Sequence, residues 1–237
     1  MRIGIIGAGS MGVTLARHLT KRGHQVSIAN SRGPESLTAL AAEIGATPVS
    51  VVVAAQAAEM VIIAIPTKAV ADLPKALFAK VPSSMVVIDL GNYHPELRDG
   101  RIDAIDRGVL DSQWVAQQIG RPVIKAFNNI LATSLLENGL PRGTKGRIAL
   151  PVAGDSLDAK TAVLQLVDEL GFDPIDVGDL DNSWRQQTGA PAYCRDLDAI
   201  ALRRALGEAD RSRVAEYRVE REAFLRRQMG AQTAKTA

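Results

Sequence analysis

The chain has 237 residues, of which 46% are hydrophobic, and a formal net charge of +2 at pH 7. These values predict a soluble globular protein of one or two domains with a full core. The net charge is too small to indicate a nucleic-acid-binding protein. Cys194 is the only cysteine, which excludes an internal disulfide framework and multi-cysteine metal sites. No leader pattern precedes the first strand, so we expect a cytoplasmic protein without a membrane span or a metal.

A hydrophobic strand at residues 2–7 runs directly into a glycine-rich turn and a helix. Gly7, Gly9 and Gly12 form G-x-G-x-x-G in the strand–turn–helix context of a dinucleotide-binding fingerprint. The first glycine allows the tight turn, the second lets the backbone approach a pyrophosphate, and the third lets the helix pack on the strand. A tight turn without a ligand is the alternative. The predicted contacts at the helix N-terminus are Gly7, Ala8, Gly9, Ser10, Met11 and Gly12.

The end of the second strand, residues 25–30, indicates which dinucleotide binds. An NAD site would usually have a carboxylate there, whereas this chain has Asn30, Ser31 and Arg32. A hydroxyl and a guanidinium can bond a 2′-phosphate that a carboxylate would repel. Ser36, which opens the next helix, is a further candidate contact. NADP is therefore predicted as the cofactor, with a solvated surface arginine as the alternative for Arg32.

Strands and helices alternate along the chain, which predicts an α/β, Rossmann-like, doubly wound and mostly parallel sheet with a C-terminal helical tail. Residues 157–170 give the clearest helix, and residues 179–191 are expected to form a loop. The predicted division is a nucleotide-binding domain at 1–182 and a loop with a helical tail at 183–237. The expected strands are 2–7, 25–30, 60–65, 85–90, 122–127, 147–153 and 173–178.

The tail from about 196 to 228 has an apolar stripe at helical spacing: Val214, Tyr217, Arg221, Phe224 and Leu225. Such an apolar stripe is expected to pack against another surface, either the chain's own sheet domain or a second subunit. We expect the tail to contribute to a homodimer.

Ligands of open α/β sheets bind at the carboxyl ends of the strands. Three loops are expected to meet there, and they contain Ile65-Pro66, Asn92 and Asn128-Asn129. Neutral amides can bond a nicotinamide or a substrate carbonyl but are not strong acids or bases, and Asn128 is the best candidate for positioning. The asparagines could instead cap helices. His94 is either a proton donor or merely solvated, and the segment from Trp184 to Cys194 is expected to cover the crevice.

Three motifs in order carry a family resemblance: residues 122–130, 150–155 and 174–180. They resemble the NADPH-dependent reductases of the 5-deazaflavin coenzyme F-420 and the related cytosolic domain of six-transmembrane metalloreductases. The resemblance covers residues 1–184. It implies that the glycine turn holds the pyrophosphate, that Ser31 and Arg32 hold the 2′-phosphate, and that Ile65-Pro66 and Ala126-Phe127-Asn128 line the nicotinamide end.

The resemblance implies an NADP(H)-dependent oxidoreductase that transfers a hydride directly between NADPH and a flavin, a deazaflavin or another small acceptor. Such transfer requires chiefly alignment of the two rings. Two alternatives stay open: a β-hydroxyacid or imine dehydrogenase-like reductase, and a non-catalytic NADP-binding sensor.

Overall fold

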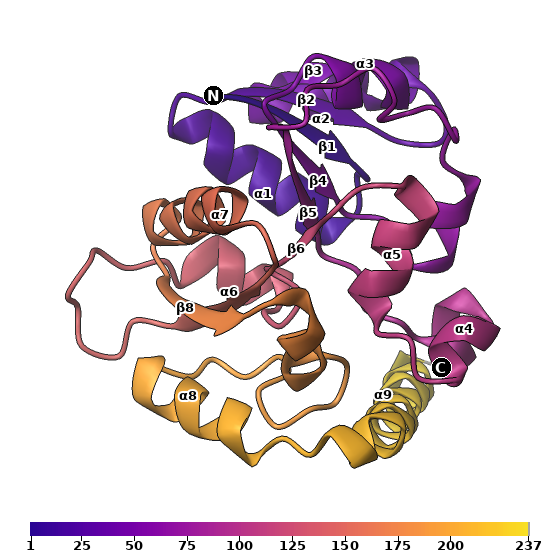
Figure 1. The fold of residues 1–237 in the computed structure, drawn as a ribbon, viewed down its shortest axis with the longest axis vertical. Coiled ribbons are helices and arrows are strands. Elements are labelled where there is room, and N and C mark those ends of the chain that lie inside the picture. Colours follow the sequence, from indigo (N-terminus) through magenta and orange to yellow (C-terminus); the bar gives the residue numbers. More distant parts are fainter. Residues whose placement is uncertain (237) are drawn as a thin grey trace.

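The computed structural model describes the backbone of residues 1–236 and the side chains of residues 1–230. One sheet of eight strands runs through the molecule in the order β3-β2-β1-β4-β5-β6-β7-β8 (Figure 1). Neighbouring strands are parallel except β6 and β7, which pair antiparallel. This confirms the predicted mostly parallel, Rossmann-like α/β fold. The strands are β1 (Arg2–Ile6), β2 (Gln25–Ala29), β3 (Thr47–Pro48), β4 (Met60–Ile63), β5 (Val86–Asp89), β6 (Ile124–Lys125), β7 (Ala149–Ala153) and β8 (Asp173–Gly178).

Helices cover both faces of the sheet. The α-helices are α1 (Ser10–Lys21), α2 (Thr38–Ile44), α3 (Val51–Gln56), α4 (Asp103–Asp106), α5 (Asp111–Ile119), α6 (Ala132–Glu137), α7 (Leu157–Glu169), α8 (Ala199–Glu208) and α9 (Val214–Thr236). The short helical turns are η1 (Pro34–Leu37), η2 (Lys68–Asp72), η3 (Pro95–Asp99), η4 (Leu180–Gln186) and η5 (Arg211–Arg213).

The hydrophobic core lies in two layers because strand side chains alternate between the faces. Ile3 and Ile5 of β1 join the layer formed with α1, α2, α6 and α7. Ile6 points the other way and packs with α3, α4 and α5. A smaller cluster holds α8 against β7 and β8. The two layers cover the sheet and leave its carboxyl edge for the loops.

Two elements differ from the sequence prediction. The edge strand β3 was not foreseen, since a two-residue strand containing a proline gives no alternation to detect. Residues 180–186, expected in a loop, form the helical turn η4, whose first turn is capped by the side chain of Asp179. The tail is helical as predicted and consists of two helices, since Asp210 accepts the backbone N–H of Ser212 and separates α8 from α9.

The C-terminal helix α9 lies beside the sheet domain near α4 (Figure 1). Tyr217 is buried, and its carbonyl approaches Gly189 so closely that a Cβ there would lie 2.0 Å away. Val219 and Phe224 remain 66% and 42% exposed. The chain itself therefore covers one part of the predicted stripe, and the homodimer stays a prediction.

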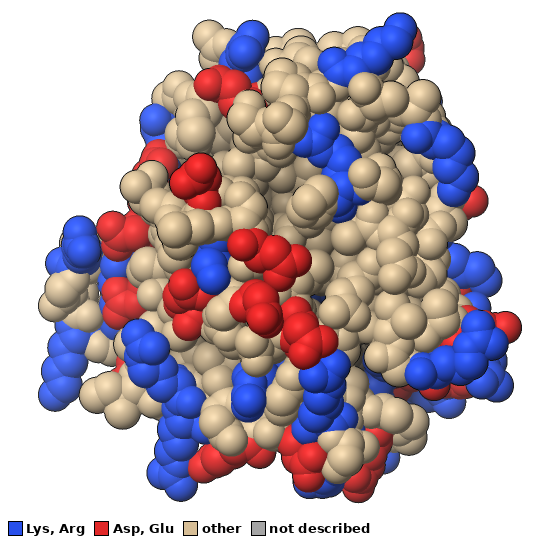
Figure 2. Space-filling model, viewed as in Figure 1, with Lys and Arg blue, Asp and Glu red and all other residues tan. Residues whose placement is uncertain are grey.

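Basic and acidic side chains are interspersed over the lower half of the face in Figure 2.

Candidate functional site

Two cavities lie at the carboxyl edge of the sheet and share Gly9, Ala64, Ile65 and Pro66. The first, called the Arg32 cavity, has a volume of about 870 Å³. The second, called the Asn128 cavity, has a volume of about 420 Å³. Predicted site residues line both. The Arg32 cavity is bordered by Gly7, Ala8, Gly9, Asn30, Ser31 and Arg32, and the Asn128 cavity by Gly9, Ser10, Met11, Asn92, His94, Phe127 and Asn128.

The glycine turn between β1 and α1 has a separate physical reason at each glycine. Gly7 has a φ of +120°, and a Cβ there would lie 2.2 Å from the carbonyl oxygen of Ala64. A Cβ on Gly12 would lie 2.0 Å from the carbonyl oxygen of Gly7. A Cβ on Gly9 would meet nothing within 4 Å. The fold therefore requires the first and third glycines, whereas the second borders open space at the N-terminus of α1, an end of a helix that favours negative charge.

The turn after β2 holds Arg32 at the rim of its cavity. The Arg32 backbone N–H donates to Oδ1 of Asn30 at 2.9 Å. The hydroxyl of Ser36 donates to the Gly33 carbonyl at 2.7 Å. Asn30 and Ser36 thus shape the turn, and Ser36 does not line the Arg32 cavity. The side chains of Ser31 and Arg32 are exposed at the mouth of the cavity.

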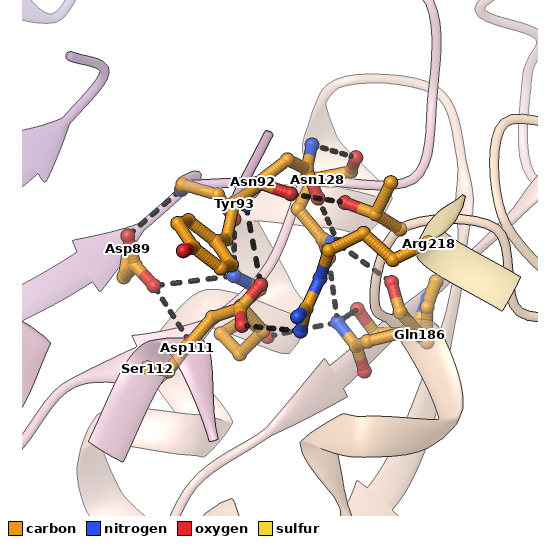
Figure 3. Close-up of polar contacts among 12 residues, drawn as sticks. Asp89, Asn92, Tyr93, Asp111, Ser112, Asn128, Gln186 and Arg218 are labelled. Atoms are coloured by element: carbon orange, nitrogen blue, oxygen red, sulfur yellow. Dashed lines mark hydrogen bonds and ion pairs between the residues drawn. The ribbon is translucent and has the colours of Figure 1, made fainter. Parts of the chain in front are cut away.

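The Asn128 side chain is buried and fully engaged (Figure 3). Its Nδ2 donates to Oδ1 of Asn92 at 3.0 Å and to the carbonyl of Gln186 at 2.7 Å. Its Oδ1 accepts from Nε2 of Gln186 at 2.9 Å. Asn92 in turn donates to the backbone carbonyl of Asn128 at 2.8 Å. The amide therefore fixes the loops of Asn92 and Asn128 relative to η4, and Ala126, a predicted neighbour, lies buried in the core.

A buried ion pair supports the same strand ends. Nζ of Lys125 lies 3.2 Å from Oδ2 of Asp89, and both side chains are fully buried. The ammonium also donates to the Gly91 carbonyl, and the Ser112 hydroxyl donates to the same carboxylate oxygen at 2.6 Å. Sequence reasoning missed this pair because the residues are far apart in the chain and each lies at the end of an apolar strand. Its hydrogen bonds satisfy charges that would be costly to bury alone.

Helix α9 contributes a second set of charges beside the Asn128 cavity. The guanidinium of Arg218 lies 3.6 Å from Oδ1 of Asp111 and over the ring of Tyr93, with 4.7 Å to the ring centroid. Burial raises the pKa of the Asp111 carboxyl. The Tyr93 hydroxyl accepts the Ile102 backbone N–H at 2.8 Å. These contacts attach the tail to the loop that carries Asn92.

His94 lines the Asn128 cavity and is not solvated, since its side chain is only 12% exposed. Burial, together with the nearby Arg98, lowers its pKa to about 4. Burial raises the pKa of the Cys194 thiol, which lines the same cavity, to about 11. Tyr193 also lines it, whereas Trp184 packs with Leu110 and Ala209 and does not. Only the last part of the predicted covering segment therefore borders the cavity.

Two residues that line the Asn128 cavity have a left-handed backbone. Phe127 has a φ of 58° and Cys194 a φ of 48°. Non-glycine residues in this region are uncommon and are held there by their surroundings. The Cys194 N–H donates to the Asn129 carbonyl at 3.0 Å, which joins the loop after β6 to the segment after η4. In the part of the chain whose side chains are described, no cluster of metal-ligating side chains is present.

Among the helices that the structure describes, none is long and apolar enough to cross a membrane.

Residues 2–93 match the family model of the NADP oxidoreductases, coenzyme F420-dependent. A stretch of 68 residues is 46% identical to the protein YjhV of Escherichia coli (strain K12). This match covers 29% of the chain and 50% of YjhV, so the chain spans half the length of that relative.

Two solved structures extend the likeness. The hypothetical protein SMa0349 of Sinorhizobium meliloti is 32% identical, with a TM-score of 0.71 over 83% of this chain and 95% of that one. A candidate F420-dependent NADP reductase from Arthrobacter sp. FB24 is 23% identical, with a TM-score of 0.64 over 77% and 87%. The latter likeness shows the shared fold. Over most of its length this chain is thus a relative of SMa0349, and its residues 2–93 resemble the NADP oxidoreductases, coenzyme F420-dependent.

Proposed function

We propose that this protein is an NADP(H)-dependent oxidoreductase that transfers a hydride directly between NADPH and a flavin, a deazaflavin or another small acceptor. The observation that carries the proposal is the pair of cavities that share Gly9 and Pro66. One ends at the exposed guanidinium of Arg32 and the other at Asn92 and Asn128. A dinucleotide bound along this edge would have its 2′-phosphate beside Arg32 and its nicotinamide ring beside Asn92 and Asn128.

The cofactor would be held by backbone groups and by the turn after β2. The first N–H groups of α1 have no carbonyl partner within the helix and face the open space beside Gly9. Ser31 and Arg32 would bond the 2′-phosphate, with Asn30 and Ser36 holding their turn. Ile65 and Pro66 would lie along the middle of the cofactor because they border both cavities.

The acceptor would lie in the Asn128 cavity. When bound, NADPH supplies a hydride from its nicotinamide ring. The protein must then hold the two reacting carbons about 3–3.5 Å apart. Asn128 acts by fixing the loops of Asn92 and Gln186, since all its side-chain bonds go to these two residues. Its role is thus to position the cavity wall, and the amide itself is not free to bond a ligand.

The test is NADPH oxidation with a panel of flavins, deazaflavins and small carbonyls. The matched control is Gly9→Asp: a side chain fits at this position, where φ is −78°, yet its carboxylate would repel a pyrophosphate. We expect turnover with a flavin-type acceptor by the parent and none by the control. Turnover with carbonyls or imines only would support a dehydrogenase-like reductase, and NADPH binding without any turnover would support a sensor.

A further inference from the structure

His94, which lines the Asn128 cavity, meets Glu222, which belongs to the C-terminal helix α9. Nδ1 of His94 lies 3.7 Å from Oε1 of Glu222, and the Glu222 side chain is only 4% exposed. Nδ1 is buried and has no hydrogen-bond partner. Glu222 also accepts the Glu96 backbone N–H at 3.2 Å, which holds the carboxyl at the start of η3. A buried unpartnered ring nitrogen and a buried carboxyl thus lie side by side next to the cavity.

The charges around the pair favour its neutral form. Arg98 and Asp99 face the imidazole from its own loop, and Arg218 and Arg221 face it from α9. Burial lowers the pKa of His94 to about 4, and the neighbouring arginines act in the same direction. Burial also raises the pKa of Glu222. An uncharged imidazole beside a protonated carboxyl is the combination that these effects favour.

Hydride transfer creates a need for a proton. An acceptor that gains a hydride carries an extra negative charge, which in a flavin-type ring rests on the nitrogen–carbonyl part. Among the residues that line the Asn128 cavity, Arg98 is held by the Asn92 carbonyl and by Asp99. The Cys194 thiol has its pKa raised to about 11. The imidazole of His94 is the group best suited to supply a proton there.

Building on the proposed function, we propose that His94 and Glu222 are the proton-transfer pair of the acceptor site. The Nε2–H bond of His94 breaks as its proton passes to the nitrogen or oxygen of the reduced acceptor. The O–H proton of Glu222 passes to Nδ1. To restore the starting state, Nδ1 returns this proton to Glu222 while Nε2 takes a proton from water. The acceptor gains one hydride and one proton in total, and NADPH leaves as NADP⁺. Glu222 acts through His94 and is a positioning and relay residue.

The kinetic test compares Glu222→Gln, His94→Gln and Glu220→Gln. The first keeps an oxygen that can accept the Glu96 N–H, so η3 stays capped. Glu220 is exposed on the same helix and serves as the matched control. We expect the two site variants to lose about 100-fold in kcat, as typical of a lost general acid. We also expect loss of the alkaline limb of the pH profile and of the solvent deuterium isotope effect, with NADPH affinity unchanged.

A second readout needs no turnover. The tautomer of His94, read from its ring ¹⁵N shifts, should carry the proton on Nε2 in the parent, and the Nδ1 shift should change in Glu222→Gln but not in Glu220→Gln. An unchanged pH profile and isotope effect in an active His94→Gln protein, or no response of Nδ1 to Glu222→Gln, overturns the inference and leaves the proposed function standing. If the parent protein oxidises NADPH in the presence of none of the tested acceptors, both the inference and the proposed function are overturned.

Discussion

The guanidinium of Arg218 in α9 lies 3.6 Å from the carboxylate of Asp111 at the start of α5, and their side chains are 9% and 1% exposed. The contact joins the C-terminal helix α9 to the start of α5. A helix that carries a charge into the interior opposite a buried carboxylate is a part of the fold, because neither charge can be left alone there without a large cost. The tail is therefore fixed to α5 by a buried pair of charges.

Arg218→Ala should destabilise the protein by about 3 kcal/mol, because it leaves Asp111 buried without its partner. The measurement is the free energy of unfolding in urea. The matched control is Arg227→Ala, which removes an exposed arginine from the same helix and should change stability by less than about 0.5 kcal/mol. Equal stability of the two variants would contradict the structural role of the pair.

Deleting the residues after Gly207 should expose the surfaces that Tyr217 and Arg218 cover and should lower the thermal stability and solubility of the protein. If the exposed face of α9 forms a homodimer, Val219→Glu should lower the mass in light scattering without lowering the melting temperature, since Val219 is 66% exposed. A truncated chain with unchanged mass and stability would show that the tail is dispensable.

The unmodified protein should bind NADPH more tightly than NADH, and Arg32→Ala should remove most of this preference. A charge-assisted hydrogen bond contributes about 1.5–3 kcal/mol, which corresponds to about ten- to a hundredfold in affinity. Calorimetric titration with both cofactors measures the effect, and Arg107→Ala, at an exposed position outside both cavities, is the control. Equal binding of the two cofactors by the parent would refute the assignment.

Asn128→Leu should lower turnover much more than it lowers NADPH affinity. The substitution removes three side-chain hydrogen bonds, so that Oδ1 of Asn92 and the carbonyl of Gln186 each lose the donor that Asn128 supplied, while the contacts of Arg32 are untouched. Leaving buried polar partners unpaired should also cost about 1–3 kcal/mol in stability. Steady-state kinetics and NADPH titration separate the effects, with Asn138→Leu on the surface as the control. Parent-like rates with every acceptor would mean that the pocket is misplaced.

Stability should fall on acidification through the pKa of His94. Because the pKa of His94 is lowered in the fold from 6.5 to about 4, the unfolded chain binds more protons between these values, so protonation favours unfolding there. The full shift corresponds to about 3 kcal/mol, lost as the pH falls from about 6.5 to about 4. Unfolding free energies measured across this range should show a shallower slope for His94→Gln than for the parent. Identical slopes would mean that the imidazole titrates normally.

The sequence by itself determined the doubly wound sheet and the glycine turn. Strand runs such as residues 60–65 and the helix at 157–170 depend on local hydrophobic periodicity, which is readable along the chain. Gly12 is required by the carbonyl of its near neighbour Gly7, and the φ of +120° at Gly7 is a property of the turn itself, although the carbonyl that its Cβ would meet belongs to the distant Ala64. The resemblance to deazaflavin-dependent NADP oxidoreductases rested on the motifs at 122–130, 150–155 and 174–180, and a match of residues 2–93 to that family's model supports it independently.

Only the tertiary structure decided which charges meet. Lys125 and Asp89, Arg218 and Asp111, and His94 and Glu222 are brought together by the packing of β5, β6 and α9. Their separations along the chain follow no helix or strand period. The residue types of a buried ion pair are also the same as those of an exposed one, so the sequence does not distinguish them. Burial and the choice of partner, which set the pKa of each group, arise when distant elements pack against each other.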